Sequence, residues 1–469
     1  MPYTTYKTNK NCYLYDRTEN EIVKISEHDY KILNAIQSGI ESEDSKKLLA
    51  RFRNYGLCEE NKFEVLEHPF SNEISFYMGE RMKQVVLQVT QNCNLRCDYC
   101  AYSGSYNNRV HSNKRMSLET ACKAVDFLFQ HSKSITKVIV GFYGGEPLLE
   151  FPLIKKVVEC VEEKYRGKNV TYSITTNGTV FTEEIVDYFY LKDIEVMVSV
   201  DGPKEVHNKQ RRFVSGEGSF DKVIENLNAV KSKYPEYYKK WNTNTVITPE
   251  QGYKCVEDFI ENDDIMQSLI SKVGLLSDVG LKSIVIYDEH VLVEQKKEEL
   301  RQMLCLLSEI DDTKSNKLFG DYLEALEKIF TSTLSKAGFS KKGLPGGPCI
   351  AGAMRAFVDV DGNIYPCEKV NECEEMIVGN INEDFYIDKV LELTNIAKST
   401  ENECKNCWAF TFCTSCIAAS IDDKGISKEK RLQKCDGVKM AVLRQMRDMT
   451  LLQEYGYDFN RQLLKEKIS

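Results

Sequence analysis

An alternation of strand-like and helix-like segments between residues 82 and 290 constrains the fold of this chain most strongly. Six short apolar runs indicate strands: QVVLQVT, KVIVGFY, NVTYSITT, IEVMVSV, NTVIT and SIVIY. Amphipathic patterns such as ETACKAVDFLFQ and FDKVIENLNAVKSKY lie between them and indicate helices. Strands separated by helices form βαβ units, so we expect an α/β fold with a parallel sheet of about six strands.

Unusual sequences follow the first four of these strands. The first runs directly into CNLRCDYC, and the next three end in YGGEP, TTNGT and SVDGP. Loops at the carboxyl ends of parallel strands usually build the active site. We therefore expect the functional site at this edge of the sheet.

The chain contains 17 cysteines among 469 residues. Its first residues, MPYTTYKTNKNCYLYD, lack the apolar core of a secretory signal, and no apolar run approaches the roughly 18 residues of a membrane span. We expect a cytoplasmic protein with no membrane partner and with reduced thiols, which act as metal ligands or catalytic groups when clustered. The formal net charge of -9 argues against a nucleic-acid partner.

The first cysteine cluster is Cys93, Cys97 and Cys100, in a C-x3-C-x2-C spacing. A structural zinc site normally takes four protein ligands, so three thiolates do not complete one. They can hold three irons of a [4Fe–4S] cube and leave the fourth iron open to a substrate or cofactor. Chance clustering, or a zinc site completed from elsewhere, is the alternative.

A second cluster lies between residues 349 and 435. Its members are Cys349, Cys367, Cys404, Cys407, Cys413, Cys416 and Cys435. Six other cysteines fall in helical patterns or near the N-terminus and are expected to be small buried hydrophobic residues: Cys12, Cys58, Cys122, Cys160, Cys255 and Cys305. The role of Cys373 stays open.

The first 80 residues indicate a separate module. CYLYD and EIVKI indicate strands, Ser26 is a candidate helix cap, and SEDSKKLLARFRNYG indicates a second helix that ends at Gly56. NKFEVLEH is a candidate closing strand, and the whole is compatible with a winged-helix arrangement. Beyond the alternating region, a helical stretch from 294 to 336 leads into the Gly/Pro/Lys-rich segment AGFSKKGLPGGP.

These motifs together resemble those of the radical SAM enzymes, which use S-adenosylmethionine (SAM) and a [4Fe–4S] cluster. The resemblance rests on CNLRCDYC and GGEP and extends through TTNGT and SVDGPKEVHNKQR. The C-terminal cysteines resemble the SPASM extension, which carries auxiliary iron–sulfur clusters. The fold implied is a partial (β/α)6 TIM-like barrel at 82–336, with a winged-helix-like leader-recognition module at 1–80 and a SPASM domain at 337–469.

The resemblance implies roles for single residues in SAM binding. Cys93, Cys97 and Cys100 match the ligands of the SAM-binding cluster, and Tyr99 matches a position near the adenine. The GGEP motif matches the part that binds the methionine amino group, where glycines permit close backbone approach and a carboxylate complements an ammonium. It consists of Gly144, Gly145, Glu146 and Pro147.

Three further polar residues match positions that face SAM in related enzymes. Asn177 and Ser199 match positions near the ribose or methionine moiety, and Arg211 matches an arginine near the SAM carboxylate. Ordinary turn or surface roles are the alternatives. The neighbouring Arg212 leaves open which guanidinium faces the site.

In the SPASM-like region the resemblance implies two auxiliary clusters, for three [4Fe–4S] clusters in all. Cys404, Cys407, Cys413 and Cys435 would hold one of them completely. Cys349, Cys367 and Cys416 would hold the other, and no cysteine between Cys349 and Cys367 supplies a fourth ligand. That cluster would have an open iron unless Cys373 fills the position. A zinc ribbon is the alternative reading of the short spacings.

The chemistry implied by the resemblance starts with SAM on the open iron, whose one-electron reduction yields a 5′-deoxyadenosyl radical that removes a hydrogen from carbon. The segment after Cys100, together with the N-terminal module, resembles maturases of cysteine-rich peptides. This implies thioether formation in a ribosomally made precursor peptide, with its leader bound at the N-terminal module and with flavodoxin or ferredoxin as electron donor.

Two other functions remain as alternatives. An anaerobic sulfatase-maturating enzyme, which makes formylglycine, would leave the N-terminal module without a role. A non-enzymatic, metal-dependent redox sensor that binds DNA disagrees with the acidic composition and with the complete set of SAM motifs.

Overall fold

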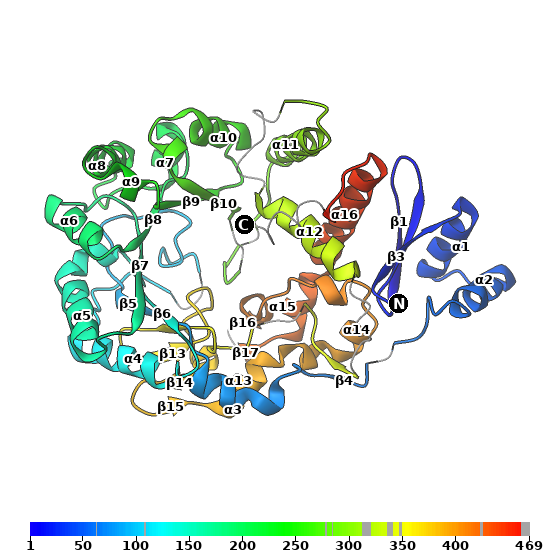
Figure 1. Ribbon diagram of the computed structural model, residues 1–469, viewed down its shortest axis with the longest axis horizontal. Helices are drawn as coiled ribbons and strands as arrows, with labels where there is room; N and C mark the ends of the chain where they lie inside the picture. The colour runs from blue at the N-terminus through cyan, green and yellow to red at the C-terminus, as the bar shows by residue number, and fades with distance from the viewer. Residues whose placement is uncertain are drawn as a thin grey trace.

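A ten-stranded sheet lies at the centre of the molecule, and its strands β5 to β10 run parallel to one another (Figure 1). The computed structural model describes residues 1–61, 63–106, 109–276, 279–283, 285–311, 320–334, 341–346, 349–422 and 425–460. Neighbouring strands in space are also neighbours in the chain, from β5 to β10. Their bounds are β5 (Gln84–Thr90), β6 (Lys137–Gly144), β7 (Asn169–Thr176), β8 (Glu195–Ser199), β9 (Asn242–Ile247) and β10 (Ile270–Leu275). The expected α/β fold with a parallel sheet is confirmed.

Helices that connect these strands lie along the outer side of the sheet (Figure 1). Ser117 caps α4 by accepting the Thr120 amide, and Thr182 caps α6 by accepting the Ile185 amide, because serine and threonine favour the N-cap position of a helix. The connecting helices are α4 (Leu118–Gln130), α5 (Phe151–Lys164), α6 (Glu183–Leu191), α7 (Lys204–Gln210), α8 (Phe220–Lys233), α9 (Pro235–Tyr238) and α10 (Tyr253–Asn262).

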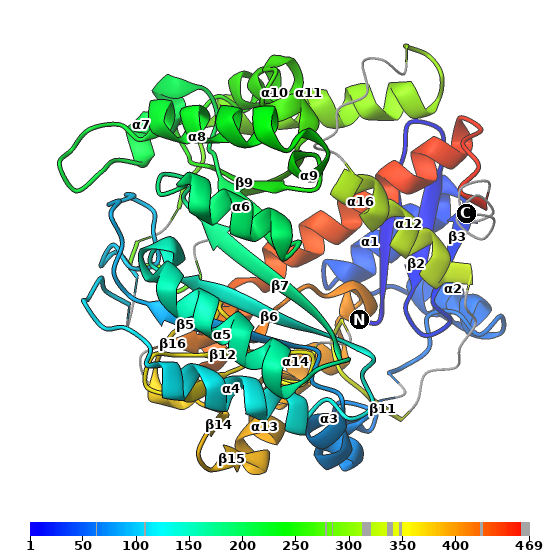
Figure 2. The same cartoon turned by 60° about the vertical axis from the view of Figure 1, so that its left-hand side comes forward.

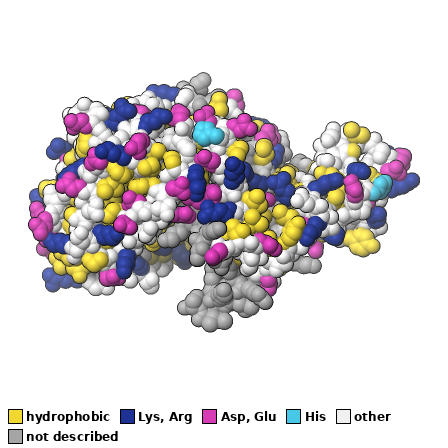
Figure 3. All heavy atoms as spheres, turned by 90° about the horizontal axis from the view of Figure 1, so that it is seen from above, with side chains coloured by type: hydrophobic (Ala, Val, Ile, Leu, Met, Phe, Trp, Pro, Cys, Tyr) yellow, Lys and Arg dark blue, Asp and Glu magenta, His cyan; other side chains and the backbone are white. Residues whose placement is uncertain are grey.

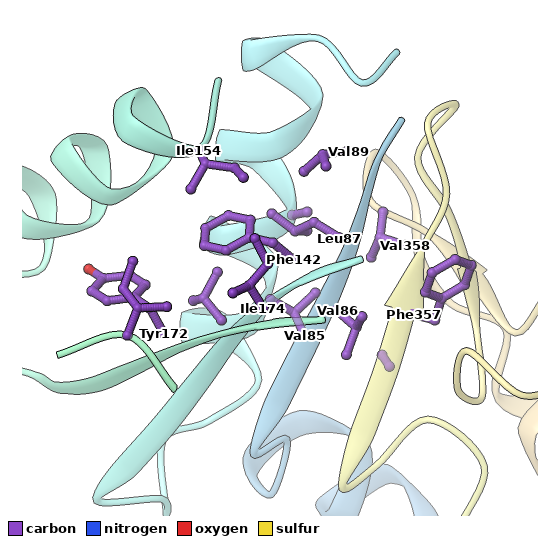
Figure 4. Close-up of a cluster of buried hydrophobic side chains, with 14 of the residues drawn as sticks. Val85, Val86, Leu87, Val89, Phe142, Ile154, Tyr172, Ile174, Phe357 and Val358 are labelled. Atoms are coloured by element: carbon purple, nitrogen blue, oxygen red, sulfur yellow. The ribbon is translucent and has the colours of Figure 1, made fainter. Parts of the chain in front are cut away.

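The main hydrophobic core lies between this sheet and its helices. Figure 4 shows Leu87 of β5, Phe142 of β6 and Ile174 of β7 beside Ile154 of α5. Each of these four side chains is at most 2% exposed. Burial of such apolar surface fixes the strand order and therefore the positions of the loops at the carboxyl ends.

The sixth strand lies earlier in the chain than SIVIY (283–287), where we predicted it. β10 spans Ile270–Leu275 and pairs with β9, whereas the described residues of 283–287 form no strand, Ile284 being outside them. None of the six residues of β10 is buried, because it is the edge strand of the sheet. Its sequence, ISKVGL, consequently lacks the apolar pattern by which a strand is recognised.

The C-terminal region continues the same sheet beyond β5. β12 (Arg355–Val358) pairs in parallel with β5, and the antiparallel strands β13 (Asn363–Tyr365), β14 (Gly379–Asn380) and β15 (Asp384–Phe385) follow it. The cysteine loops of this region alternate with the helices α13 (Ile387–Thr394), α14 (Glu401–Lys405), α15 (Lys428–Gln433) and α16 (Cys435–Glu454) and with the hairpin of β16 (Ile421–Asp422) and β17 (Gly425–Ile426).

The N-terminal residues form an antiparallel sheet in the order β1-β2-β3, followed by two helices. These elements are β1 (Tyr3–Lys7), β2 (Cys12–Asp16), β3 (Glu21–Ile25), α1 (Glu27–Gln37) and α2 (Glu43–Arg53). Ser26 caps α1 as predicted. β1 was not predicted, and NKFEVLEH does not close this sheet. Its β4 (Val65–Leu66) pairs instead with β11 (Lys342–Gly343), where Leu66 packs against Leu344, Ala397 and Phe410.

The remaining helices join these parts. α3 (Ile74–Glu80) precedes β5, and α11 (Glu289–Leu306) and α12 (Gly320–Leu334) follow β10. α12 and α16 lie against each other and beside the N-terminal sheet (Figures 1 and 2). The 3-10 helices are Ser71–Glu73, Pro147–Glu150, Met266–Ser268, Glu374–Met376, Ile396–Thr400, Phe410–Phe412 and Ile417–Ser420. The domain boundaries at residues 80 and 336 stay predictions.

Charged side chains of both signs are interspersed on the face shown in Figure 3. Within the described ranges, none of the helices combines the length and the apolar composition that crossing a membrane would need.

Candidate functional site

The first cysteine cluster lies in the loop at the carboxyl end of β5. Charges on Cys97 and Cys100 both raise the pKa of the Cys93 thiol, which shows that the three sulfurs are neighbours. Burial is the largest cause and raises the pKa of Cys93 to about 12 and that of Cys97 to about 11. The amides of Leu95 and Tyr102 donate to the sulfurs of Cys93 and Cys100 over 3.3 and 3.4 Å. Thiolates are the ligands of iron–sulfur clusters. Within the residues that the structure describes, no three His, Cys, Asp or Glu side chains are arranged to hold a metal ion, so the role of these cysteines as cluster ligands stays a prediction.

Two glycines at the end of β6 hold this loop in place. The Gly145 amide donates to the Thr90 carbonyl and the Glu146 amide to the Asn92 carbonyl, each over 2.8 Å. A Cβ atom on Gly144 would lie 2.1 Å from Thr90 O, and one on Gly145 would lie 2.1 Å from Asn92 O. Both positions therefore require glycine for close contact with the chain that leads into the cysteines.

Glu146 is completely buried and ties the end of β6 to the end of β7. Its carboxylate accepts the Leu148 amide at 3.0 Å, the Thr176 hydroxyl at 2.7 Å and the Asn177 amide at 2.7 Å. Burial raises its pKa to about 7, against the opposing effect of these donors. The carboxylate thus already has three partners within the protein, and its expected role toward the methionine ammonium stays a prediction. Pro147 is buried at the start of the 3-10 helix that follows.

Asn177 lies directly beside the cysteine loop, and its expected role toward SAM stays a prediction. Its Nδ2 donates to Asn94 Oδ1 at 2.9 Å and lies 3.8 Å from Cys93 Sγ, while its Oδ1 accepts the Thr179 amide and hydroxyl. Ser199 is 7% exposed at the end of β8, where it pairs in register with Asn244.

The structure distinguishes the two adjacent arginines. Arg211 is buried, and its Nη1 lies 3.9 Å from Cys97 Sγ, whereas Arg212 is exposed and its Nε donates to the Asn208 carbonyl. Arg211 Nε donates to Asp201 Oδ2 at 2.8 Å, and its guanidinium lies 5.3 Å from the centre of the Tyr99 ring. The guanidinium that faces the cysteine loop is therefore that of Arg211.

Asp201 is a member of this site that sequence reasoning missed. It is fully buried, accepts the Tyr99 hydroxyl and the Val246 amide, and carries the negative charge that Arg211 pairs with. Asp201 belongs to the SVDGP sequence at the end of β8, and this position at the carboxyl end of a strand could have predicted its place in the site. Asp201, Arg211 and Tyr99 together fix the side of the loop that carries Cys97.

A second set of residues that sequence reasoning missed joins the cysteine loop to the C-terminal region. Arg109 Nε lies 3.1 Å from the Glu372 carboxylate, which also accepts the Tyr102 hydroxyl at 2.9 Å and the Gln88 amide at 2.9 Å. Arg109 Nη2 donates to the Glu368 and Val370 carbonyls. Arg109 and Glu372 are remote in sequence, so no local pattern could pair them.

The C-terminal cysteines divide into two neighbourhoods. Burial is the main cause that raises the pKa of the Cys435 thiol. Negative charge on Cys404, Cys407 and Cys413 raises this pKa further. Cys416 and Cys349 act in the same way on Cys367, whose pKa burial raises to about 11. These neighbourhoods contain the same cysteines as the two predicted ligand sets. Their role as ligands stays a prediction.

Cys373 directly precedes the 3-10 helix Glu374–Met376. Burial, followed by the neighbouring Glu375 carboxylate, raises the pKa of its thiol to about 11. Its role as a fourth ligand stays open. Cys12, Cys58 and Cys305 are buried as expected, but Cys122 and Cys160 are half-buried and Cys255 is exposed. The helical pattern correctly placed these three on helices but did not predict their exposure.

Comparisons with known proteins identify a family over the part of the chain that contains this site. The family model described as the radical SAM superfamily matches residues 87–262, which include the first cysteine cluster, GGEP, Asn177 and the Asp201–Arg211 pair. An uncharacterized protein of Methanocaldococcus jannaschii is 31% identical over 309 residues, which cover 65% of this chain and 91% of that protein. A cysteine-type anaerobic sulfatase-maturating enzyme of Clostridium novyi is 27% identical over 357 residues, which cover 71% of this chain and 87% of that enzyme.

A solved structure shares the fold. Native anSMEcpe with bound AdoMet and Cp18Cys peptide superposes with a TM-score of 0.58 at 21% identity, covering 80% of this chain and 99% of that one. The family model covers the strands and loops that carry the candidate site, and the archaeal relative aligns over nearly its whole length. The chain belongs to the radical SAM superfamily and is a SAM-dependent enzyme.

Proposed function

We propose that this enzyme removes a hydrogen atom from a ribosomally made, cysteine-rich precursor peptide and links a cysteine sulfur of that peptide to carbon. The observation that carries the proposal is the neighbourhood of Cys349, Cys367 and Cys416. Three thiolates leave one iron of a [4Fe–4S] cube without a protein ligand. An iron of this kind is suited to hold the thiolate of a substrate cysteine.

The same proposal assigns the other cofactors. Cys93, Cys97 and Cys100 would hold the SAM-binding cluster, and Cys404, Cys407, Cys413 and Cys435 would hold a fully ligated auxiliary cluster. When bound, the first cluster and SAM supply an electron and a 5′-deoxyadenosyl radical that takes hydrogen from carbon. Flavodoxin or ferredoxin would provide the electron.

The protein's own residues would orient the reactants. Gly144 and Gly145 keep the cysteine loop against β6, while Glu146 joins the ends of β6 and β7. Arg211, held by Asp201, places a positive charge beside Cys97, where it would attract the SAM carboxylate. Such fixed charges act without reorganisation at the moment of reaction.

A peptide substrate is supported by the relatives. The Clostridium novyi protein is named as a maturating enzyme, and the superposed structure contains a peptide. That structure aligns with 80% of this chain, which leaves a segment without a counterpart. We assign the N-terminal sheet to leader recognition, because a peptide strand added to the edge of a sheet gains affinity through backbone hydrogen bonds.

The test uses anaerobically reconstituted enzyme with a leader-bearing, cysteine-rich precursor. We expect 5′-deoxyadenosine and a product that has lost the mass of two hydrogens for each link, with the linked cysteines resistant to alkylation. Cys367→Ser should stop link formation and leave SAM cleavage in place, whereas Cys255→Ser, at an exposed cysteine, should behave as wild type. A precursor that stays unmodified while SAM is cleaved contradicts the proposal.

Formylglycine formation is the second candidate, favoured by the 27% identity to the sulfatase-maturating enzyme of Clostridium novyi. The same reaction run with a sulfatase-derived peptide separates the two functions. A product that reacts with a carbonyl-specific probe would support this candidate and not thioether formation.

A further inference from the structure

A buried arginine of the N-terminal sheet reaches one of the C-terminal cysteine loops. Arg17 follows β2 and is 2% exposed. Its Nη1 donates to the backbone carbonyls of Lys405 at 2.7 Å and Cys407 at 2.9 Å. Its Nη2 donates to Asn61 Oδ1 at 2.9 Å. The guanidinium therefore lies at the loop that contains Cys404 and Cys407.

Aromatic rings enclose the same guanidinium. Its central carbon lies 5.2 Å from the centre of the Phe63 ring and 5.5 Å from that of Phe410. Tyr15 of β2 packs against Phe412, with 5.9 Å between the ring centres. The end of β2 thus contacts the loop between Cys407 and Cys413 through apolar and aromatic surfaces that keep water away from Arg17.

The hydrogen bonds of the Arg17 guanidinium go to neutral acceptors, two backbone carbonyls and one side-chain amide oxygen. Among the residues that the structure describes, no Asp or Glu forms an ion pair with it, and its Nε is buried without a hydrogen-bond partner. The adjacent Asp16 accepts the amides of Glu19 and Cys58 instead.

A buried, unpaired cation is costly unless an anion lies nearby. A [4Fe–4S] cluster with four thiolates is such an anion, and it gains negative charge when it accepts an electron. A positive charge inside the protein stabilises the more negative, reduced state of such a cluster more than its oxidised state.

We infer that Arg17 is the charge partner of the cluster assigned to Cys404, Cys407, Cys413 and Cys435, and that it raises the reduction potential of this cluster. The inference rests on the cluster assignment in the proposed function and is independent of the peptide product. Because Arg17 belongs to the N-terminal sheet, the docking of that sheet and the electron affinity of the cluster are coupled.

The test is a redox titration of full-length, anaerobically reconstituted enzyme, followed by electron paramagnetic resonance without peptide. The paramagnetic signal that disappears in the Cys435→Ala variant is assigned to this cluster. Arg17→Gln should lower the ratio of reduced to oxidised cluster at least tenfold at a fixed potential, which corresponds to about 59 mV for one electron. Arg17→Lys, which keeps the charge, should retain a ratio closer to wild type.

A matched control is Arg51→Gln, in the same N-terminal segment. The Arg51 side chain is 56% exposed and pairs with the buried Asp29 of α1, so its replacement should leave every potential unchanged. The signal of the SAM-binding cluster is an internal control and should not move in either Arg17 variant.

Arg17→Gln with full iron content and a wild-type potential would overturn the inference. If Arg17→Gln does not retain the cluster, the Arg17→Lys variant tests the inference instead. A reduction potential near that of wild type supports the charge role of Arg17, and a tenfold change in the ratio of reduced to oxidised cluster rejects it. Full iron content in Cys435→Ala and Cys404→Ala would instead refute the cluster assignment, while failure to form thioethers leaves the titration unaffected.

Discussion

Buried polar residues around the first cysteine loop depend on one another for their charge states. His207 is fully buried next to the Asp201–Arg211 pair, and its Nδ1 accepts the Asp201 amide over 3.4 Å. Its Nε2 lies 2.9 Å from the Ser219 hydroxyl. Burial, followed by the charge of Arg211, lowers its pKa to about 4, so the folded protein holds this imidazole neutral.

This neutral histidine predicts a pH-dependent stability. An imidazole in the unfolded chain has a pKa of about 6.5, above that of folded His207, so stability present above about pH 6.5 is lost as the pH falls toward 4. Between pH 7 and pH 5, the free energy of unfolding of wild type should fall about 2 kcal/mol more than that of His207→Gln. Urea unfolding of the metal-free protein, followed through the buried Trp241, measures this difference.

His290→Gln is the matched control, because the His290 side chain is 53% exposed. Its pH dependence should coincide with that of wild type. Equal pH slopes for wild type and His207→Gln would show that the buried imidazole does not set this dependence.

Residue identity alone identified much of the site but not its pairings. The spacing of the cysteines predicted a cluster, and the family resemblance pointed to GGEP and to Arg211 or its neighbour. Arg211 could not be distinguished from Arg212 until the structure showed which guanidinium meets Asp201 and Cys97. The interaction of Arg109 with Glu372 was beyond any local pattern, because two separate loops supply its members.

At the level of elements, the contact between the end of β6 and the loop after β5 determines the site. The two glycines allow the backbones to meet, so a methyl group at Gly145 would displace the Asn92 carbonyl. We expect Gly145→Ala to reduce 5′-deoxyadenosine formation about 100-fold, since small displacements of reacting groups can cost that much. Anaerobic SAM-cleavage assays with iron analysis measure the effect.

Gly79→Ala is the appropriate comparison, because a Cβ at this position of α3 has no heavy atom within 4 Å. It should retain both iron content and SAM cleavage. Wild-type activity in Gly145→Ala would contradict the proposed need for close backbone contact.

Elements with buried apolar faces were predictable, and those without them were not. β5 and β7 coincide with the runs QVVLQVT and NVTYSITT, and Ser26 caps the predicted helix. β10 was not predicted, because none of its residues is buried. β4 was assigned to the wrong sheet, because Leu66 packs on the C-terminal region. Local periodicity reports burial on one face but not which distant segment provides it.

At the scale of the whole molecule, the two ends of the chain pack together. Glu454, the last residue of α16, accepts the Thr8 hydroxyl at 2.9 Å, the Asn11 amide at 2.5 Å and the Tyr13 hydroxyl at 2.8 Å. The Tyr6 hydroxyl bonds to Thr450 at 2.8 Å. The N-terminal sheet is therefore held by the C-terminal helix as well as by Arg17.

Glu454→Ala removes an acceptor shared by three donors. We expect it to weaken this docking by about 1 kcal/mol, because three partly buried donors lose their shared acceptor. Hydrogen exchange should become faster in β1 and β2, with little change in β5–β7. Glu43→Ala, whose side chain is 77% exposed, should leave exchange unchanged, and equal protection in both variants would argue against this contact.

The sequence by itself determined the parallel α/β class, the two clusters of cysteines and the superfamily motifs, because these depend on periodicity and on residue types at short spacing. Only the tertiary structure decided which side chains from distant segments meet: Asp201 with Arg211, Arg109 with Glu372, and Arg17 with the Cys407 loop. It also joined β12 to β5 and the N-terminal sheet to α16. Such contacts depend on burial and charge balance across the whole fold, which no local segment of sequence contains.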